Sequence, residues 1–499
     1  MKKNLFLIFI QLIIFKFTFS QEIKYDNVSV ELSKLKNDRE NYFASREILY
    51  NADSLLTVGY DIPLSENELK VSDYLSSLQK SFIQSTGKDF PPSNFFYEGR
   101  QMIDTNMVFK IFRKMPKGGL LHLHPSAGGN AEWVISNITY MDNCYMYTSH
   151  DGKIRYGAMM FFHPDSVKAG WESFKILREV ERIIDEELMQ LLTFDQSDKG
   201  NKRIWLDFES VFRRMGLTAY EPAFRMFTRA LFDSLLADGS QHIELRTSLG
   251  GVYDLNGNIL THEECLLIYK EIIKDVKELH PEFTAKLIFS DFRGAPKETV
   301  MKDLLTAYDL RKKYPELLIG FDQVAEEDRW NKTSYYLEQF FAIDSIAKKE
   351  GYDLPYYFHD GESTLPSNDN LIDAVMLNTR RIGHGINLFR FPMLELAVKE
   401  KKIAVEVCPI SNQILGYVQD LRMHPASGYI KRNIPITINT DDPQIFNYNG
   451  LTYDFWTAFM AWELDLRTIK KLALNSLVYS GLNKDEKKEA LKYFNMKWD

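Results

Sequence analysis

The feature that most constrains the fold is a regular alternation that begins near Gly118. Eight short apolar runs alternate with longer stretches, most of which carry apolar residues at helical spacing. The runs cover residues 119–125, 242–249, 285–292, 317–324, 355–362, 381–388, 403–412 and 435–443. Strands that alternate with helices form parallel sheets, and continuous apolar runs fit a sheet buried on both faces. Eight such units predict an α/β fold, a closed (β/α)8 barrel of the TIM type.

Two other segments do not follow this alternation. Residues 21–114 carry helical patterns and no strand-like alternation, so they predict an N-terminal helical region. The first and second runs are separated by residues 126–241, which is far more than a normal crossover. We therefore expect a barrel domain at 115–499 that contains an inserted domain at about 128–200.

The first 20 residues have a pattern of their own. Two lysines precede a stretch over residues 5–15 that is almost wholly apolar, and Thr18 and Ser20 suit cleavage by signal peptidase after Ser20. An uncleaved N-terminal anchor is the alternative, although a membrane span needs about 20 apolar residues. We expect a signal peptide at 1–20 and a secreted protein, periplasmic if bacterial, without membrane attachment after cleavage.

Charge and cysteine content narrow the class of protein. The chain has 61 basic and 69 acidic residues and a formal net charge of −8. This composition lacks the excess of positive charge that binding to duplex nucleic acid requires. The three cysteines, Cys144, Cys265 and Cys408, allow at most one disulfide within the chain. A disulfide scaffold is therefore excluded.

Reactive side chains gather at the ends of four predicted strands. They are His122-Leu-His124 in the first, His359-Asp-Gly-Glu362 in the fifth, Gly383-His384-Gly385 in the sixth and Thr440-Asp441-Asp442-Pro443 in the eighth. The C-terminal ends of the strands meet at one mouth of a (β/α)8 barrel. These distant residues should therefore become neighbours.

The paired histidines suggest a metal site. His122 and His124 are two residues apart, so both side chains of a strand point to the same face. Such a pair is more often a surface pair or a satisfied buried pair, but leucines surround this one, and an isolated polar group in a buried strand needs a partner. His359 and Asp441 would complete a set of three histidines and one carboxylate, which suits Zn²⁺.

Three further residues have both a structural and a chemical interpretation. Glu362 is either a solvated loop carboxylate or a group that holds or shuttles a proton beside a metal. His384 is either a core histidine or a group that orients or deprotonates metal-bound water, with a glycine on each side that permits close approach. Asp441 and Asp442 either form a turn before Pro443 or point to opposite sides and divide metal binding from substrate binding.

Five motifs, in this order along the chain, resemble the signature set of the adenosine deaminase family within the metal-dependent hydrolase superfamily. They are residues 115–124 (MPKGGLLHLH), 358–362 (FHDGE), 381–385 (RIGHG), 406–412 (EVCPISN) and 439–443 (NTDDP). Residues 91–96 (PPSNFF) and 451–455 (LTYDF), with the signal peptide, the helical extension and the insertion, resemble the secreted adenosine deaminase growth factor branch of that family.

The resemblance implies zinc-dependent hydrolytic deamination of adenosine or 2′-deoxyadenosine. One zinc ion would be held by the residues that match the family's ligands, His122, His124, His359 and Asp441. In the family, the residue at Glu362 protonates purine N1, the residue at His384 assists the attacking hydroxide, and the residue at Asp442 binds N7. The branch also implies a homodimer formed by the N-terminal helices and an inserted receptor-binding domain.

Several positions bear on substrate choice. The family usually has an aspartate that contacts the ribose shortly after the paired histidines, and this chain has Pro125-Ser126 there. The branch has a histidine where this chain has Phe292, and Ala325 replaces the glycine whose N–H meets purine N3. Trp205 does match a branch tryptophan that lines the ribose site.

These departures leave alternatives open. The chain could be another hydrolase of the same superfamily that acts on a different purine or a modified nucleoside, or a binding protein that only keeps the fold. The complete set of metal and proton-transfer residues argues against a pure binding protein. A cytidine-deaminase type of site is excluded because the chain has no Pro-Cys-x-x-Cys motif.

Overall fold

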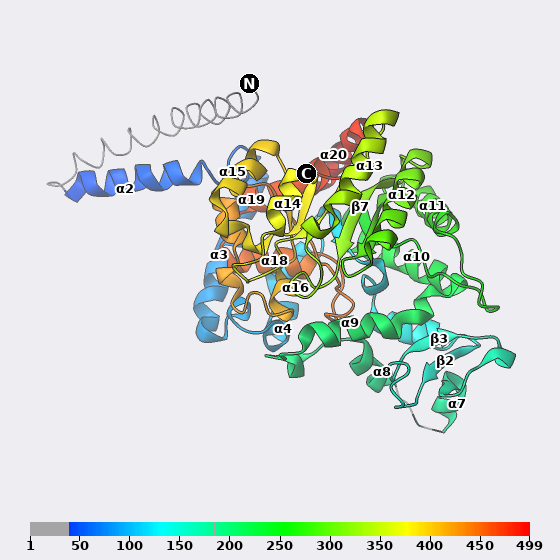
Figure 1. The fold of residues 1–499 in the computed structure, drawn as a ribbon. Helices are drawn as coiled ribbons and strands as arrows, with labels where there is room; N and C mark the ends of the chain where they lie inside the picture. Colours follow the sequence, from blue (N-terminus) through cyan, green and yellow to red (C-terminus); the bar gives the residue numbers. More distant parts are fainter. Residues whose placement is uncertain (1–38, 181, 183–184) are drawn as a thin grey trace.

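The computed structural model describes residues 39–180, 182 and 185–499 of the chain. The predicted signal peptide, residues 1–20, lies outside this range. Figure 1 shows a body with strands at its centre and helices around them, from which α2 (Arg39–Ser54) projects. Among the described residues, no helix is both long and apolar enough to cross a bilayer.

Eight parallel strands form the centre of the body. They pair as two four-stranded sheets, in the orders β1-β5-β6-β7 and β11-β10-β9-β8. Their bounds are β1 Gly118–Leu123, β5 Ser240–Thr247, β6 Thr284–Phe292, β7 Leu318–Val324, β8 His359–Asp360, β9 Arg381–His384, β10 Ala404–Val407 and β11 Ile436–Ile438. Each predicted apolar run overlaps one of these strands, so the predicted strand order is confirmed.

Single parallel bridges join the two sheets along both of their edges. At one edge Phe321 pairs with Tyr356: the Phe321 N–H donates to Pro355 O, and the Tyr357 N–H donates to Phe321 O, each at 2.9 Å. At the other edge Leu123 pairs with Asp441, and the N–H of Asp441 donates to the carbonyl of His122 at 3.2 Å. The ring is therefore closed as a (β/α)8 barrel, as the eight runs predicted.

Helices cover the outside of the ring where the sequence has helical periodicity. α11 (His262–Leu279) begins with a capping box, in which Thr261 and Glu264 each accept the other's backbone N–H. The further helices after the strands are α12 Lys297–Lys313, α13 Leu337–Glu350, α14 Asn370–Met376, α15 Pro392–Lys401, α16 Pro409–Ile414, α17 Ala426–Lys431, α18 Thr452–Ala461, α19 Leu466–Val478 and α20 Lys484–Trp498. α19 packs against both β1 and β11 and so covers the seam between the two sheets.

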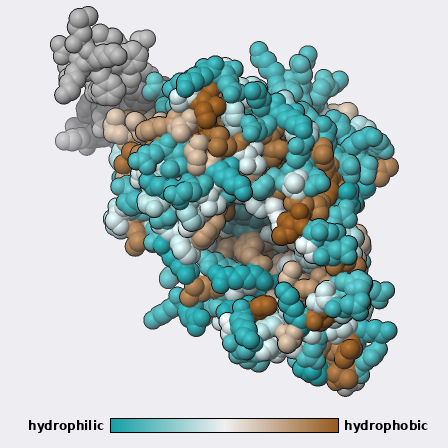
Figure 2. Space-filling model, turned by 45° about the vertical axis from the view of Figure 1, so that its right-hand side comes forward, coloured by the Kyte–Doolittle hydropathy of each residue, from teal (hydrophilic) through white to brown (hydrophobic). Residues whose placement is uncertain are grey.

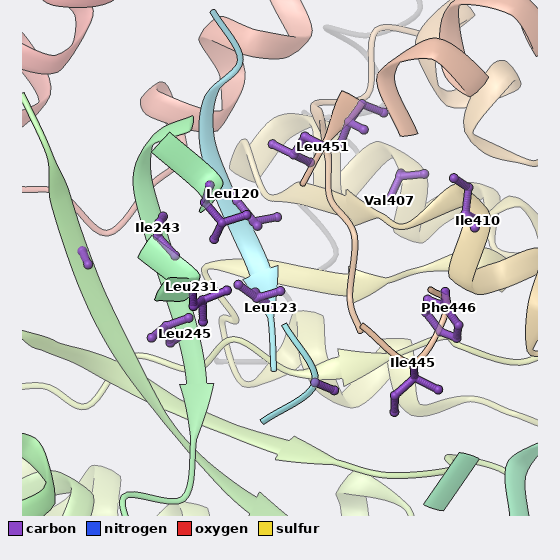
Figure 3. Close-up of a cluster of buried hydrophobic side chains, with 14 of the residues drawn as sticks. Leu120, Leu123, Leu231, Ile243, Leu245, Val407, Ile410, Ile445, Phe446 and Leu451 are labelled. Atoms are coloured by element: carbon purple, nitrogen blue, oxygen red, sulfur yellow. The ribbon is translucent and has the colours of Figure 1, made fainter. Parts of the chain in front are cut away.

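The core lies between the strands and these outer helices. Every residue of β1 is buried. Figure 3 shows Leu120 and Leu123 of β1 beside Ile243 and Leu245 of β5, with Leu231 of α10 (Glu221–Ala237) next to them. Burial on both sides explains why the strands read as continuous apolar runs.

The described part of the N-terminal region is helical. α3 (Glu66–Thr86) packs against α19 and α5, and α4 (Phe96–Thr105) and α5 (Met107–Phe112) follow it. α4 and α5 are separate helices because Asn106 has an extended backbone and its side chain caps α5 by accepting the N–H of Val108.

The segment between β1 and β5 has a small sheet of its own. β2 (Cys144–Tyr147), β3 (Met159–Phe161) and β4 (Trp171–Ser173) pair antiparallel in the order β3-β2-β4. Tyr147, Ala158 and Trp171 form a separate small core there. α9 (Ile204–Arg214) and α10 return the chain to the barrel, and the limits of the inserted domain at about 128–200 stay a prediction.

Substitution of Gly320 tests how closely the backbones of β7 and β8 approach where the two sheets join. A Cβ at this position would lie 2.3 Å from Pro355 O and 2.6 Å from the ring of Tyr357. We expect Gly320→Ala to lower the free energy of unfolding by about 1–3 kcal/mol, because the backbones at the seam must separate. Gly250→Ala is the matched control, since its Cβ would make only ordinary van der Waals contacts, at 3.5 Å with the His262 ring and 3.7 Å with Ser248 O. Equal urea midpoints for the two variants would contradict a tightly closed seam.

Candidate active site

The predicted metal-binding residues meet at the C-terminal mouth of the barrel. His122 lies near the end of β1, His124 just after it, His359 at the start of β8, and Asp441 after β11. The Nε2 atoms of His122 and His124 each lie 3.3 Å from Asp441 Oδ1. The Nε2 atoms of His124 and His359 are also 3.3 Å apart. The structure thus brings together four side chains from three distant parts of the sequence.

These atoms fit a zinc ion. His122 Nε2 is buried and has no hydrogen-bond partner, which is a costly arrangement unless a cation binds it. Ligand atoms at about 2.0–2.1 Å from zinc in a tetrahedron lie about 3.3 Å from one another. Three of the six spacings among these four side chains, namely His122–Asp441, His124–Asp441 and His124–His359, have this value.

Two buried carboxylates orient two of the histidines. His122 Nδ1 lies 2.8 Å from Glu406 Oε2, and His359 Nδ1 lies 2.6 Å from Asp322 Oδ2. A carboxylate accepts a hydrogen bond from Nδ1–H, so the proton stays on Nδ1 and the Nε2 of each ring keeps its lone pair, which faces the centre of the site. This is the arrangement that orients histidine ligands in metal proteins.

One guanidinium group holds both carboxylates. Arg246, which is buried, donates from Nε to Asp322 at 2.7 Å, from Nη1 to Leu121 O at 2.6 Å and from Nη2 to Glu406. Arg381 also donates to Glu406. Burial opposes ionisation of Glu406, but Arg246 and Arg381 hold its pKa well below the usual value.

Three residues of the mouth have left-handed backbone angles. The φ angles are 60° at His384, 67° at Asp441 and 99° at Ala325. Non-glycine residues adopt such angles only when the surrounding structure holds them, and they gather at functional sites. Gly383 permits a close approach of two histidines, because a Cβ there would lie 3.1 Å from both His122 Cε1 and His359 Cα.

Glu362 points into the site with no hydrogen-bond partner for its Oε1 atom. The carboxylate of Glu327 accepts the N–H groups of Gly361 and Glu362 at 3.0 and 2.7 Å and so fixes this turn. Glu362 Oε1 is buried and unpaired, 3.5 Å from His384 Nδ1. Burial, with the nearby carboxylates of Asp441 and Glu327, raises the pKa of Glu362 well above its usual value. Such a group can hold a proton at neutral pH.

A chain of hydrogen bonds sets the tautomer of His384. The N–H of Ala426 donates to His424 Nδ1 at 3.1 Å, so the proton of His424 is on Nε2, which lies 3.1 Å from Asn412 Oδ1. The amide nitrogen of Asn412 then donates to His384 Nδ1 at 3.2 Å. Burial lowers the pKa of His384 well below its usual value. The neutral ring therefore has its proton on Nε2, 4.0 Å from Asp441 Oδ2.

A cavity of about 180 Å³ lies over these groups. It is lined by His124, Trp205, Phe208, Glu209, Phe212, Val324, Ala325, His359, Glu362, His384, Asp441 and Asp442. Asp442 Oδ1 is buried and unpaired, and burial together with Asp441 raises the pKa of Asp442 well above its usual value. The space-filling view also shows one face of the molecule that is hollowed, with less polar side chains inside the hollow (Figure 2).

Every residue predicted for the site lies in this cavity or directly below it. No role is predicted from the sequence for five residues that orient the histidines, namely Asp322, Glu406, Arg246, Asn412 and His424. The sequence nevertheless marks some of these five residues as unusual. Arg246 interrupts an apolar strand, and Glu406 and Asn412 lie within a recognised motif. Polar residues inside a buried strand need partners, but the sequence does not identify those partners.

The comparisons with known proteins agree with this geometry. Family models described as "Adenosine deaminase" and "Adenosine/AMP deaminase N-terminal" match residues 185–495 and 7–112. The chain is 35% identical to adenosine deaminase 2 of Dictyostelium discoideum, covering 92% of this chain and 86% of that protein. It is 33% identical to adenosine deaminase 2 of Homo sapiens, covering 91% and 92%.

Solved structures share the fold at low identity. The Arabidopsis protein ADAL complexed with GMP superposes with a TM-score of 0.57 at 16% identity, covering 78% of this chain and 98% of that chain. Adenine deaminase of Arthrobacter aurescens gives a TM-score of 0.55 at 19% identity, covering 76% and 98%. With the sequence relatives and the convergent histidine and carboxylate site, these findings show that the chain belongs to the adenosine deaminase family of enzymes.

Proposed function

We propose that the chain is a zinc-dependent deaminase that converts adenosine or 2′-deoxyadenosine to inosine or 2′-deoxyinosine and ammonia. The observation that carries this proposal is the meeting of the Nε2 atoms of His122, His124 and His359 with Asp441 below a cavity that also contains the unpaired Glu362. His384 lies in the same cluster of possible ligands. The metal set and the proton donor thus face the same small space.

The proposed metal ligands are His122, His124, His359 and Asp441. A zinc ion bound there would polarise a water molecule and lower its pKa toward ~7, which supplies a nucleophile at neutral pH. The Ser411 hydroxyl donates to Asp441 Oδ2 at 2.7 Å, which leaves Oδ1 to face the histidines.

The protein residues supply the proton transfers. Glu362 donates a proton to purine N1 and makes C6 electrophilic, and protonated Asp442 donates a hydrogen bond to N7. The oxygen of water bonds to C6, the bond between C6 and the amino nitrogen breaks, and ammonia leaves. One proton of the water restores Glu362 and the other leaves with ammonia, so the purine keeps the proton on N1 and a 6-oxo group.

His384 acts through its Nε2–H. Because Asn412 donates to Nδ1, the neutral ring presents a donor and not an acceptor to the reacting oxygen. We therefore assign His384 the stabilisation of charge on that oxygen as it bonds to C6.

A second substrate class is favoured by the same cavity. Ala325 takes a strained backbone angle and adds a methyl group to the wall of the base site, and Trp205, which matches the tryptophan of the ribose site, lines the same cavity. A different purine or a modified nucleoside is therefore the alternative substrate of the same metal-dependent hydrolysis.

We also propose where and in what form the enzyme works. The pattern of residues 1–20 supports export, so the expected location is extracellular, or periplasmic in a bacterium. α2 exposes Tyr42, Ile48, Leu49 and Tyr50, each at least 42% accessible. Exposed apolar surface of this kind favours association, and it supports a homodimer formed through the N-terminal helical region.

Removal of the metal tests the proposed reaction. Adenosine mixed with the purified mature chain should shift to the ultraviolet spectrum of inosine, and the shift should stop after treatment with a zinc chelator and return when zinc is added. The reason is that the nucleophile depends on the metal. No shift from a protein shown to contain zinc would contradict adenosine as the substrate.

Glu362→Gln tests the proton donor. We expect kcat to fall by at least about 100-fold, because a side-chain amide cannot transfer a proton, while the zinc content stays unchanged. The matched control is Glu298→Gln on the exposed face of α12, which should keep full activity. Equal kcat values for the two variants would remove Glu362 from the mechanism.

Asn412→Asp tests the tautomer of His384. A carboxylate accepts where the amide donates, so it moves the proton of His384 from Nε2 to Nδ1. We expect kcat to fall by about 100-fold with little change in KM, and the ¹⁵N chemical shifts of His384 to report the exchanged tautomer. His424→Gln, whose amide can still donate to Asn412, should retain more activity than His424→Leu. An unchanged tautomer with an equal loss in all three variants would indicate a packing role only.

A further inference from the structure

A second cavity adjoins the cavity that holds the reacting groups. Its volume is about 350 Å³, and the two cavities share His124, Phe212 and Val324 in their walls. It lies at the ends of β1, β5 and β6, under α10 and α11. The first cavity, at about 180 Å³, is smaller than the ~300–1,000 Å³ typical of ligand sites. A nucleoside that reacts in the first cavity therefore extends into a neighbouring space.

The walls of the second cavity are mainly apolar. Phe227 and Val252 line it as buried residues, and Phe292, which is 42% exposed, lines it where it meets the surface. Among the described residues that line it there is no aspartate, glutamate or lysine. Its serine and threonine hydroxyls are weaker partners than a carboxylate for a sugar hydroxyl.

The one cationic side chain in the second cavity is already engaged. All three nitrogen atoms of Arg246 donate to protein acceptors, namely Asp322, Glu406 and the carbonyl of Leu121. Thr218 donates to Met215 O at 2.8 Å, and Thr247 accepts the N–H of Leu249 at 3.2 Å. The cavity is thus better suited to bury an apolar group than to bind a hydroxyl.

The position of the reacting C6 atom determines which part of the nucleoside lies near the second cavity. C6 must lie beside the metal ligands and Glu362, and the sugar is attached on the far side of the purine, at N9. The end of the sugar that lies farthest from the base is its 5′ carbon. Because the two cavities share His124 and Val324 in their walls, we place the 5′ substituent in the second cavity.

We propose that the second cavity selects purine nucleosides with an apolar group in place of the 5′-hydroxyl, such as 5′-deoxy-5′-alkylthio nucleosides. The inference rests on the proposed deaminase function and names its substrate class. Burial of the alkylthio group is favourable, whereas a 5′-hydroxyl loses water and meets no charged acceptor. An apolar pocket rejects an added hydroxyl only moderately, so adenosine remains a slower substrate.

The first experiment compares three substrates on the zinc-loaded mature chain. We expect kcat/KM for 5′-deoxy-5′-methylthioadenosine to exceed that for adenosine by about 10-fold or more, with 5′-deoxyadenosine between them. Adenosine with an equal or higher kcat/KM than the methylthio compound would overturn the inference and leave the deaminase function intact. Preference for an N6-alkylated adenosine over all three would also overturn it.

A variant tests whether this cavity sets the preference. Pro125→Asp adds a charged acceptor beside His124, and we expect it to reduce the preference for the methylthio compound at least about 10-fold. Met393→Asp adds the same charge at a position that is 70% exposed in α15, and it should leave the preference unchanged. An equal preference in both variants would contradict a role for this cavity.

Binding of the products tests the selectivity of the second cavity separately from the deaminase function. If no nucleoside is deaminated, the proposed function fails. Calorimetry with 5′-deoxy-5′-methylthioinosine and inosine then still tests the cavity, because binding needs no turnover. Tighter binding of the methylthio compound, again by about 10-fold, supports the inference, and equal or weaker binding overturns it.

Discussion

The rest of the site depends on one buried guanidinium group. Arg246 joins Asp322 to Glu406, and these carboxylates in turn accept from the Nδ1 atoms of His359 and His122. Two anions at the centre of a barrel are tolerated only because the cation is present, and removing one member leaves an uncompensated buried charge. The pairing that stabilises the interior therefore also turns the lone pairs of two histidines toward one point. Core stability and metal-site geometry are coupled through the same contacts.

The barrel makes this coupling possible. Arg246 on β5, Asp322 on β7 and Glu406 on β10 reach one another only because the ring of strands is closed. The strained backbone at His384 and Asp441 lies at the rim, where the strands end and the chain turns. The interior is thus held by charge pairing and the rim by backbone conformation, and the reacting groups lie between the two.

The sequence predicts the scaffold better than the fine geometry. Apolar runs and helical periodicity are local signals, so the eight strands and the residues at their ends could be placed before the structure was known. The run at 355–362 nevertheless has only a two-residue strand, which ends where Glu327, distant in sequence, accepts the N–H groups of Gly361 and Glu362. The small sheet near Cys144 has strands of three or four residues, too short to give a clear alternation.

The partners of the histidines could not be predicted for a related reason. His122 and Glu406 are 284 positions apart, and Arg246 and Glu406 are 160 apart. Such pairs follow from the order and register of the strands, which a single sequence does not encode locally. The tautomer of His384 depends on a chain of contacts that reaches Ala426 in α17, and no local pattern marks that chain.

Anomalous diffraction at the zinc edge from crystals of the purified chain tests whether these residues form a metal site. We expect one strong peak per chain, bounded by the Nε2 atoms of His122, His124 and His359 and by Asp441 Oδ1, with the Nδ1 contacts to Glu406 and Asp322 preserved. A peak at other residues, or zinc-loaded crystals with no peak at this position, would contradict the claim that the Arg246 network arranges these histidines as a metal site.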